Sequence, residues 1–184
     1  MIITIIEIVH LVIASLVVGY IFLGVINLPK KNEDLISIKR FNWRDYWFSV
    51  LATSPGVILH ELAHKIIAIS FGLKAYFTVW PFGLVLGVVL KLLGLGFVIL
   101  APGYVNIHPG ATELQYSLIA FAGPFLNLIL WIIALLVVKY KKNISRNEAI
   151  FWVFTREINK WLFIFNMIPI NPLDGYKIYG RFIY

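Results

Sequence analysis

Cysteine is absent from all 184 residues of the chain. This absence excludes disulfide bonds and metal sites built from thiolates. Charged residues are also scarce, at 14% of the sequence, whereas a soluble domain carries about a quarter. No internal repeat or low-complexity segment is visible. These features exclude a secreted disulfide scaffold and a disordered chain, and so little charge does not fit a cytosolic enzyme.

Hydrophobic residues, by contrast, account for 60% of the sequence. The length allows one domain, so we expect a single polytopic domain over residues 1–184, embedded in the lipid bilayer. The net charge of +7 comes from basic residues gathered between apolar runs, around residues 30–44 and 139–146. Basic residues in such places typically contact lipid headgroups, and we therefore expect no nucleic acid partner.

Four apolar runs approach or exceed the roughly 20 residues that a helix needs to cross a bilayer. They predict an all-α membrane fold with about four transmembrane helices, in a multi-pass integral protein of the cell membrane. The first run has no basic segment before it and no clear cleavage site, so we interpret it as a retained helix rather than a signal peptide. The runs cover residues 2–28, 47–71, 114–138 and 149–170.

The segment from Trp80 to Leu100 is apolar, but glycines and Lys91 interrupt it. Its Val, Ile and Phe content is typical of strands. If it crossed the membrane once, the polar motifs described below would lie in opposite leaflets. We therefore predict a re-entrant or membrane-dipping β segment near residues 75–110. A pair of short helices that enter and leave on one side is the alternative.

An H-E-x-x-H motif, formed by His60, Glu61 and His64, lies inside the second run. Residues four apart share a face of a helix, so the two imidazoles can bind one metal ion, and Glu61 can act as a general base toward water. An ionisable group at the bilayer centre costs about 2.5–3.5 kcal/mol, so such residues indicate function. The alternative is that the histidines only bond neighbouring helices.

Two histidines leave a catalytic zinc site incomplete, because such sites usually have three protein ligands and one open position. Asp174 is the preferred third ligand, since it lies between Pro172 and Gly175, which interrupt the chain after the fourth run. Its alternative role is to cap a helix in the tail over residues 175–184. The other candidates are His108, Glu113, Glu148 and Glu157.

Together with the H-E-x-x-H motif, two further motifs resemble the site-2 protease family of intramembrane zinc metalloproteases. The resemblance implies a catalytic core over about residues 47–184, preceded by an extra N-terminal helix over residues 2–28. In chain order, the three motifs are H-E-x-x-H at residues 60–64, G-P-x-x-N at residues 123–127 and N-x-x-P-x-x-P-x-D-G at residues 166–175.

The family resemblance also implies a cofactor, a reaction and a substrate class. One zinc ion would be held by His60, His64 and Asp174, and Glu61 would activate water to hydrolyse a peptide bond. The substrates would be transmembrane proteins. A β-hairpin beside the active site would receive the unwound substrate, because a helix must be extended before a protease can reach its backbone.

The G-P-x-x-N motif has a supporting role under the same resemblance. Asn127 would help to hold or polarise the substrate, although a hydrogen bond between helices is an equal alternative. Gly123 and Pro124 would allow a close helix approach and a kink rather than take part in the chemistry. If successive runs alternate in direction, all three motifs lie at one membrane level, provided that residues 74–113 return to the side they left.

Glu7 and His10 share a face of the first run. We expect Glu7 to extend toward the membrane edge and His10 to bond a neighbouring helix. A water path to the zinc ion is the alternative for both.

Two other functions would use the same polar residues. A divalent-metal transporter or carrier could bind a metal transiently, but such proteins are often built from repeated halves, and no repeat is visible. A catalytically inactive relative could bind membrane partners instead. The intact set of His60, Glu61, His64 and Asp174 favours an enzyme over that relative.

Overall fold

The computed structural model describes residues 3–24, 41–94 and 102–183. Most of these residues are helical, and one small sheet is present. The basic residues between positions 30 and 40, which were expected to contact lipid headgroups, lie outside the described residues. In chain order the elements are α1 (Ile5–Phe22), α2 (Trp43–Ser70), β1 (Ala75–Val79), α3 (Pro81–Leu92), β2 (Gly103–Ile107), α4 (Glu113–Tyr140), α5 (Arg146–Asn166) and α6 (Asp174–Ile183).

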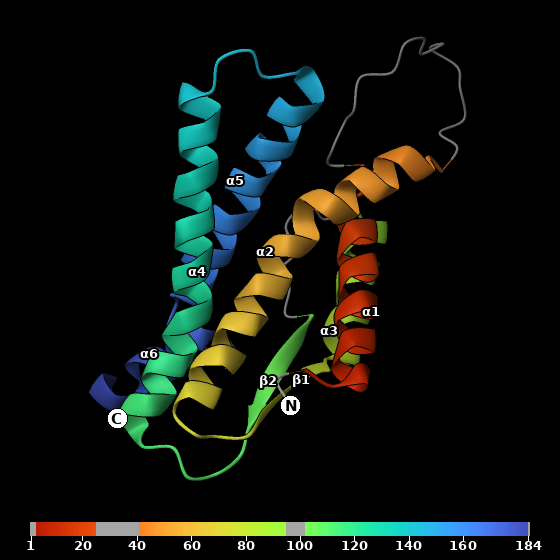
Figure 1. The fold of residues 1–184 in the computed structure, drawn as a ribbon. Coiled ribbons are helices and arrows are strands. Elements are labelled where there is room, and N and C mark those ends of the chain that lie inside the picture. The colour runs from red at the N-terminus through yellow and green to blue at the C-terminus, as the bar shows by residue number, and fades with distance from the viewer. Residues whose placement is uncertain (1–2, 25–40, 95–101, 184) are drawn as a thin grey trace.

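Four long helices occupy the four apolar runs, and they alternate in direction along the chain (Figure 1). Helix α4 packs against α2 and α5, and α2 also packs against α1. At the start of each of these four long helices, a side-chain oxygen accepts hydrogen bonds from backbone N–H groups of the first turn. This contact fixes where the helix begins. These capping residues are Thr4, Asn42, Thr112 and Ser145.

Helices α1 and α4 are long and apolar enough to cross a membrane, and they are the two such helices in the described part of the chain. In an apolar stretch of 18 residues in each helix, 28% of the α1 residues and 22% of the α4 residues are buried, so most of them are at least partly exposed, unlike those of a buried core helix. Helices α2 and α5 form where they were predicted, but they carry more polar residues. The structure therefore shows two candidate spans, and the predicted four stay a prediction.

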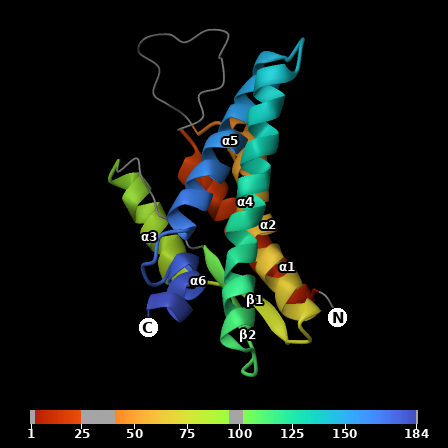
Figure 2. The same cartoon turned by 90° about the vertical axis from the view of Figure 1, so that its left-hand side faces the viewer.

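The segment after α2 leaves and returns at the same end of the molecule. Strands β1 and β2 pair antiparallel, with Ala75 opposite Ile107 and Val79 opposite Gly103. The end of α2 and the start of α4 consequently lie close together, in the lower part of both views (Figure 1 and Figure 2). The expectation that residues 74–113 return to their starting side is met by this arrangement.

The β prediction for this segment is confirmed only in part, because α3 lies between the two strands. Pro81 occupies the first helical turn, where its missing N–H carries no cost. Gly83, Leu84 and Gly87 form the buried face of α3, which packs against α1. Helix α3 has 12 residues, about 18 Å, and is too short to cross a hydrocarbon core of about 30 Å. Residues 95–101 lie outside the described part.

Glu7 was expected to extend toward the membrane edge. It is instead buried inside the protein, with 3% of its surface exposed. Its carboxylate forms an ion pair with Lys65 of α2 and accepts a hydrogen bond of 2.8 Å from the backbone N–H of Phe77 in β1. His10 also turns toward β1, with Nδ1 3.4 Å from the Phe77 carbonyl oxygen. This side of α1 therefore holds the sheet against α2.

Candidate metal centre

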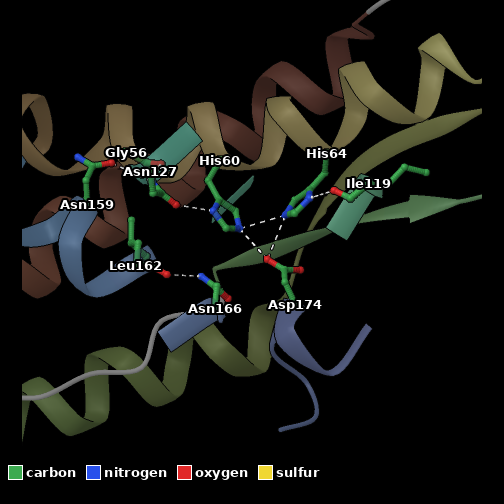
Figure 3. A network of polar contacts seen from close by, with 9 residues as sticks. All are labelled: Gly56, His60, His64, Ile119, Asn127, Asn159, Leu162, Asn166 and Asp174. Atoms are coloured by element: carbon green, nitrogen blue, oxygen red, sulfur yellow. Dashed lines mark hydrogen bonds and ion pairs between the residues drawn. The ribbon is translucent and has the colours of Figure 1, made fainter. Parts of the chain in front are cut away.

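Helix α2 places His60 and His64 one turn apart on one face. Their Nε2 atoms lie 3.0 Å from each other, and both residues are buried, at 6% exposure each. Figure 3 shows the two rings pointing toward one another and toward Asp174. The helical spacing of the H-E-x-x-H motif therefore brings the two imidazoles together as predicted.

Asp174 reaches the same point from the opposite side, at the first residue of α6. Its Oδ2 lies 3.0 Å from His60 Nε2 and 3.2 Å from His64 Nε2. The chain turns sharply between α5 and α6 to place it there. A Cβ on Gly175 would overlap the backbone of Ile168 in this turn, so the turn requires a glycine after Asp174. A helix in the tail, on which the alternative role of Asp174 as a cap depends, is also present, as α6.

The three ligand atoms form a small triangle that suits one metal ion. Two atoms that coordinate a tetrahedral zinc ion at about 2.0–2.2 Å lie roughly 3.3–3.6 Å apart, close to the separations given above. Two imidazole nitrogens and one carboxylate oxygen are also ligands that zinc prefers. Both the geometry and the chemistry of His60, His64 and Asp174 thus fit one zinc ion.

The Nδ1 atom of each ring has a hydrogen-bond partner, which leaves Nε2 available to a metal ion. His64 Nδ1 donates to the Ile119 carbonyl oxygen at 2.7 Å. His60 Nδ1 lies 2.5 Å from Asn127 Oδ1. Partners of this kind fix the tautomer and the orientation of a ligating histidine.

Asp174 is held in its ionised form. Burial of the carboxyl group alone would raise its pKa. The contacts with both histidine side chains outweigh burial, so the pKa of Asp174 lies well below its usual range. An ionised carboxylate is the form that binds a cation.

Gly123 lets α4 approach the metal centre closely. A Cβ at this position would overlap the ring of His64 and would lie 2.7 Å from Cε1 of His60. Next to it, Pro124 is fully buried within α4. One turn further on, Asn127 is also fully buried, and it does not line the cavity described next. Its side chain instead joins α4 to α2 and α5.

A cavity of about 510 Å³ opens beside the three ligands. Glu61, which is 7% exposed, lines it together with His60 and His64. Strand β2 forms another wall over residues 103–107, and Lys177 of α6 lines the cavity as well. The cavity therefore brings a carboxylate, a cationic side chain and the backbone of a strand to the metal centre.

The other candidate ligands lie elsewhere. Glu148 pairs with Lys141 near the far end of α4 and α5. Glu157 is held by Arg156 and Lys160. His108 and Glu113 are exposed near the start of α4. Asp174 is the candidate that the structure brings to the two histidines.

Two polar residues near the site were not singled out from the sequence. Asn159 of α5 is 1% exposed and contacts Asn127. Lys65, next to His64, is 3% exposed and pairs with Glu7. A polar residue inside an apolar run is the signal that could have identified both, although the sequence does not say which partner each has.

The fold and the site define a helical protein with a zinc-binding centre of the H-E-x-x-H kind. Over 94% of its length, the chain is 33% identical to "Putative zinc metalloprotease MJ0611" of Methanocaldococcus jannaschii, covering 82% of that protein. It is also 33% identical over 71% of its length to "Putative zinc metalloprotease YwhC" of Bacillus subtilis, covering 67% of that protein. The chain therefore belongs to this family of zinc metalloproteases. No protein-family profile and no solved structure matches it.

Proposed function

We propose that this chain is an intramembrane zinc metalloprotease of the site-2 protease kind. Its reaction is the hydrolysis of peptide bonds within or near the transmembrane segments of membrane proteins. The observation that carries the proposal is the triangle of ligand atoms from His60, His64 and Asp174, which faces a cavity shared with Glu61. The family of metalloproteases to which the chain belongs supports the same reaction class.

The chemistry divides between the ligands and Glu61. His60, His64 and Asp174 would hold a zinc ion, which would lower the pKa of a bound water molecule toward about 7 and polarise the scissile carbonyl group. Glu61 accepts the proton of the attacking water and later delivers it to the leaving amine. With two imidazoles and one carboxylate as ligands, a bound zinc ion would keep a net positive charge, which would favour the negative charge that develops on the substrate carbonyl oxygen.

The substrate binds along β2. This strand pairs with β1 on one edge, and its residues line the cavity beside Glu61. An extended peptide can add to the other edge as a further strand, and main-chain hydrogen bonds then hold it without demanding a particular sequence. A transmembrane helix must be unwound to bind in this way, so the substrate class is transmembrane segments that unwind readily.

The membrane setting rests on the outer faces of the helices. Large apolar side chains on α1 and α4 are exposed, among them Ile5, Ile6 and Ile132. In a lipid bilayer such faces lie against the acyl chains. Helices α2 and α5, at 28 and 21 residues, span about 42 and 32 Å. We infer that they complete a four-helix transmembrane core in which the polar side chains of α2 face inward.

The test compares two kinds of substrate with the same purified protein in detergent and in lipid vesicles. One probe is a tagged single-span protein with a Gly-Pro pair inside its span, and the other is soluble casein. We expect cleavage of the single-span protein within its apolar segment, with zinc present. Casein separates an intramembrane protease from a metalloprotease that acts on soluble proteins.

The Glu61→Gln variant tests the general base. We expect it to keep its zinc and to lose turnover by about 100-fold or more, because general base catalysis contributes about 10²–10⁴. Retained turnover in this variant would exclude the role given to Glu61. Tightly bound zinc with no cleavage of either probe by the parent would favour the inactive relative, and transport of zinc into vesicles would favour the carrier.

A further inference from the structure

Asn159 lies behind the metal centre, at the end of a chain of buried amides. It comes from α5, is 1% exposed and does not line the cavity. Its Nδ2 donates to the Thr155 carbonyl oxygen at 2.7 Å, and its Oδ1 accepts a hydrogen bond of 2.8 Å from Asn127 Nδ2. In the described part of the chain, the hydrogen bond to Asn127 is what links Asn159 to the metal centre (Figure 3).

The partners of Asn127 determine which way its amide faces. Its Nδ2 lies 3.0 Å from the Gly56 carbonyl oxygen and 2.8 Å from Asn159 Oδ1. Both atoms can only accept hydrogen bonds, so the NH₂ group must face them. The opposite orientation would set an oxygen against two oxygens. The Oδ1 atom of Asn127 is consequently directed at His60.

The amide orientation in turn sets the tautomer of His60. Because Asn127 Oδ1 only accepts, the ring nitrogen 2.5 Å away, Nδ1, carries the proton. The Nε2 atom is then left with a lone pair directed toward Asp174 and His64. A reversed amide would donate to Nδ1 and move the proton to Nε2, which is the atom that must bind zinc.

We propose that Asn159 is a positioning residue of the zinc site. Acting through Asn127, it holds His60 in the tautomer that offers Nε2 to the metal. The contact joins three helices, since Gly56 belongs to α2, Asn127 to α4 and Asn159 to α5. Gly56 makes room for it, because a Cβ there would lie 2.9 Å from Asn159 Oδ1. The proposal rests on the zinc site and does not depend on which peptide is cleaved.

The test is zinc affinity, measured by competition with a chelator in detergent, for three variants of the full chain. We expect Asn127→Leu to weaken zinc binding by about 10–100-fold, as is typical when a partner of a ligating histidine is lost. Asn159→Leu is expected to weaken it by roughly 10-fold, at the low end of this range. Since Asn159 acts through Asn127, the double variant should match Asn127→Leu alone. Additive losses would overturn the proposal.

Two further variants separate positioning from stability. Asn159→Asp keeps an oxygen that accepts from Asn127, so it should bind zinc more tightly than Asn159→Leu. Ser49→Ala removes a different fully buried hydrogen bond, from Ser49 Oγ to the Gly19 carbonyl oxygen, and should leave zinc affinity unchanged. Equal losses in Asn159→Asp and Asn159→Leu, or a loss in Ser49→Ala, would contradict a positioning role.

A further test uses the unsubstituted chain, so its result does not depend on whether a variant folds. After zinc is removed, nitrogen NMR of the labelled histidines reports which nitrogen of each ring is protonated. We expect the proton of His60 on Nδ1 even without zinc, because the amides hold it there. A ring of His60 protonated on Nε2 and not on Nδ1 would overturn the proposal. Zinc affinity and tautomer are both independent of proteolysis, so failure of the proposed function would be seen separately.

Discussion

The rings of His60 and His64 meet at α4 only because residue 123 has no side chain. A Cβ there would occupy the space of both rings, and both rings are fixed from behind by Asn127 and Ile119. The rings cannot move away without losing these hydrogen bonds. A side chain at position 123 would therefore cost the two histidines either their packing against α4 or the hydrogen bonds that orient them.

The Gly123→Ala variant tests this dependence. We expect it to weaken zinc binding by at least tenfold and to lower the free energy of unfolding by about 1–3 kcal/mol, as overpacking does. Gly180→Ala is the matched control, because a Cβ at Gly180 meets nothing within 4 Å. Chelator competition and thermal unfolding in one detergent would measure both effects. Normal zinc affinity in Gly123→Ala would show that the rings have room to move.

At the scale of elements, the sheet is tied to the helices by a buried ion pair. Glu7 of α1 pairs with Lys65 of α2 and accepts from the backbone of β1 at Phe77. The same strand pairs with β2, which lines the cavity. The pair thus fixes the position of the strand to which the substrate is proposed to add.

Removing one partner of this pair should be costly. The Glu7→Gln variant leaves the Lys65 ammonium buried without a counter-charge, and breaking such a pair costs about 3–5 kcal/mol. We expect the unfolding temperature to fall by on the order of 10 °C. The double variant Glu7→Met with Lys65→Met removes both charges and should recover most of the loss.

An exposed pair provides the control for this prediction. Glu148→Gln breaks the pair with Lys141 at the surface, and surface ion pairs contribute little to stability. Its unfolding temperature should match that of the parent. A Glu7→Gln variant as stable as the parent would show that water reaches Lys65.

The sequence predicted the long helices and the ligands well, because both have local signals. Runs of about 20 apolar residues indicate helices, and the spacing of His60 and His64 places both on one helix face. Asp174 came from its motif. The structure places all three ligands together.

Other features have no local signal. Glu7 and Lys65 are 58 positions apart, and Asn127 and Asn159 are 32 positions apart, so only the packing of helices reveals each pair. Helix α3 was predicted as β structure because the Val, Ile and Phe content of its segment is typical of strands. Packing of its Gly83 and Gly87 face against α1 overrides that propensity.

For the molecule as a whole, two long apolar helices are the feature that suggests association with a membrane. Helices α1 and α4 are long and apolar, and most of their residues are at least partly exposed, while the polar side chains of the metal centre are buried between α2, α4 and the start of α6. Among the described residues, no buried side-chain nitrogen or oxygen lacks a hydrogen-bond partner. Buried polar side chains are therefore satisfied within the protein, as they must be in water and in lipid alike.

We therefore predict that the chain behaves as an integral membrane protein. After expression, it should stay in the membrane fraction through an alkaline carbonate wash and be released only by detergent. A peripheral protein of the same host, held by charge alone, provides the control and should be washed off. Release of this chain by carbonate would contradict the four-helix transmembrane core.

The most direct test is the zinc content of the purified chain, compared between the parent, Asp174→Ala and Glu61→Gln. His60, His64 and Asp174 fit one ion, so we expect about one zinc per chain in the parent. A large loss is expected in Asp174→Ala and none in Glu61→Gln. Full zinc in Asp174→Ala, or no zinc in the parent after resupply, would contradict the proposed centre.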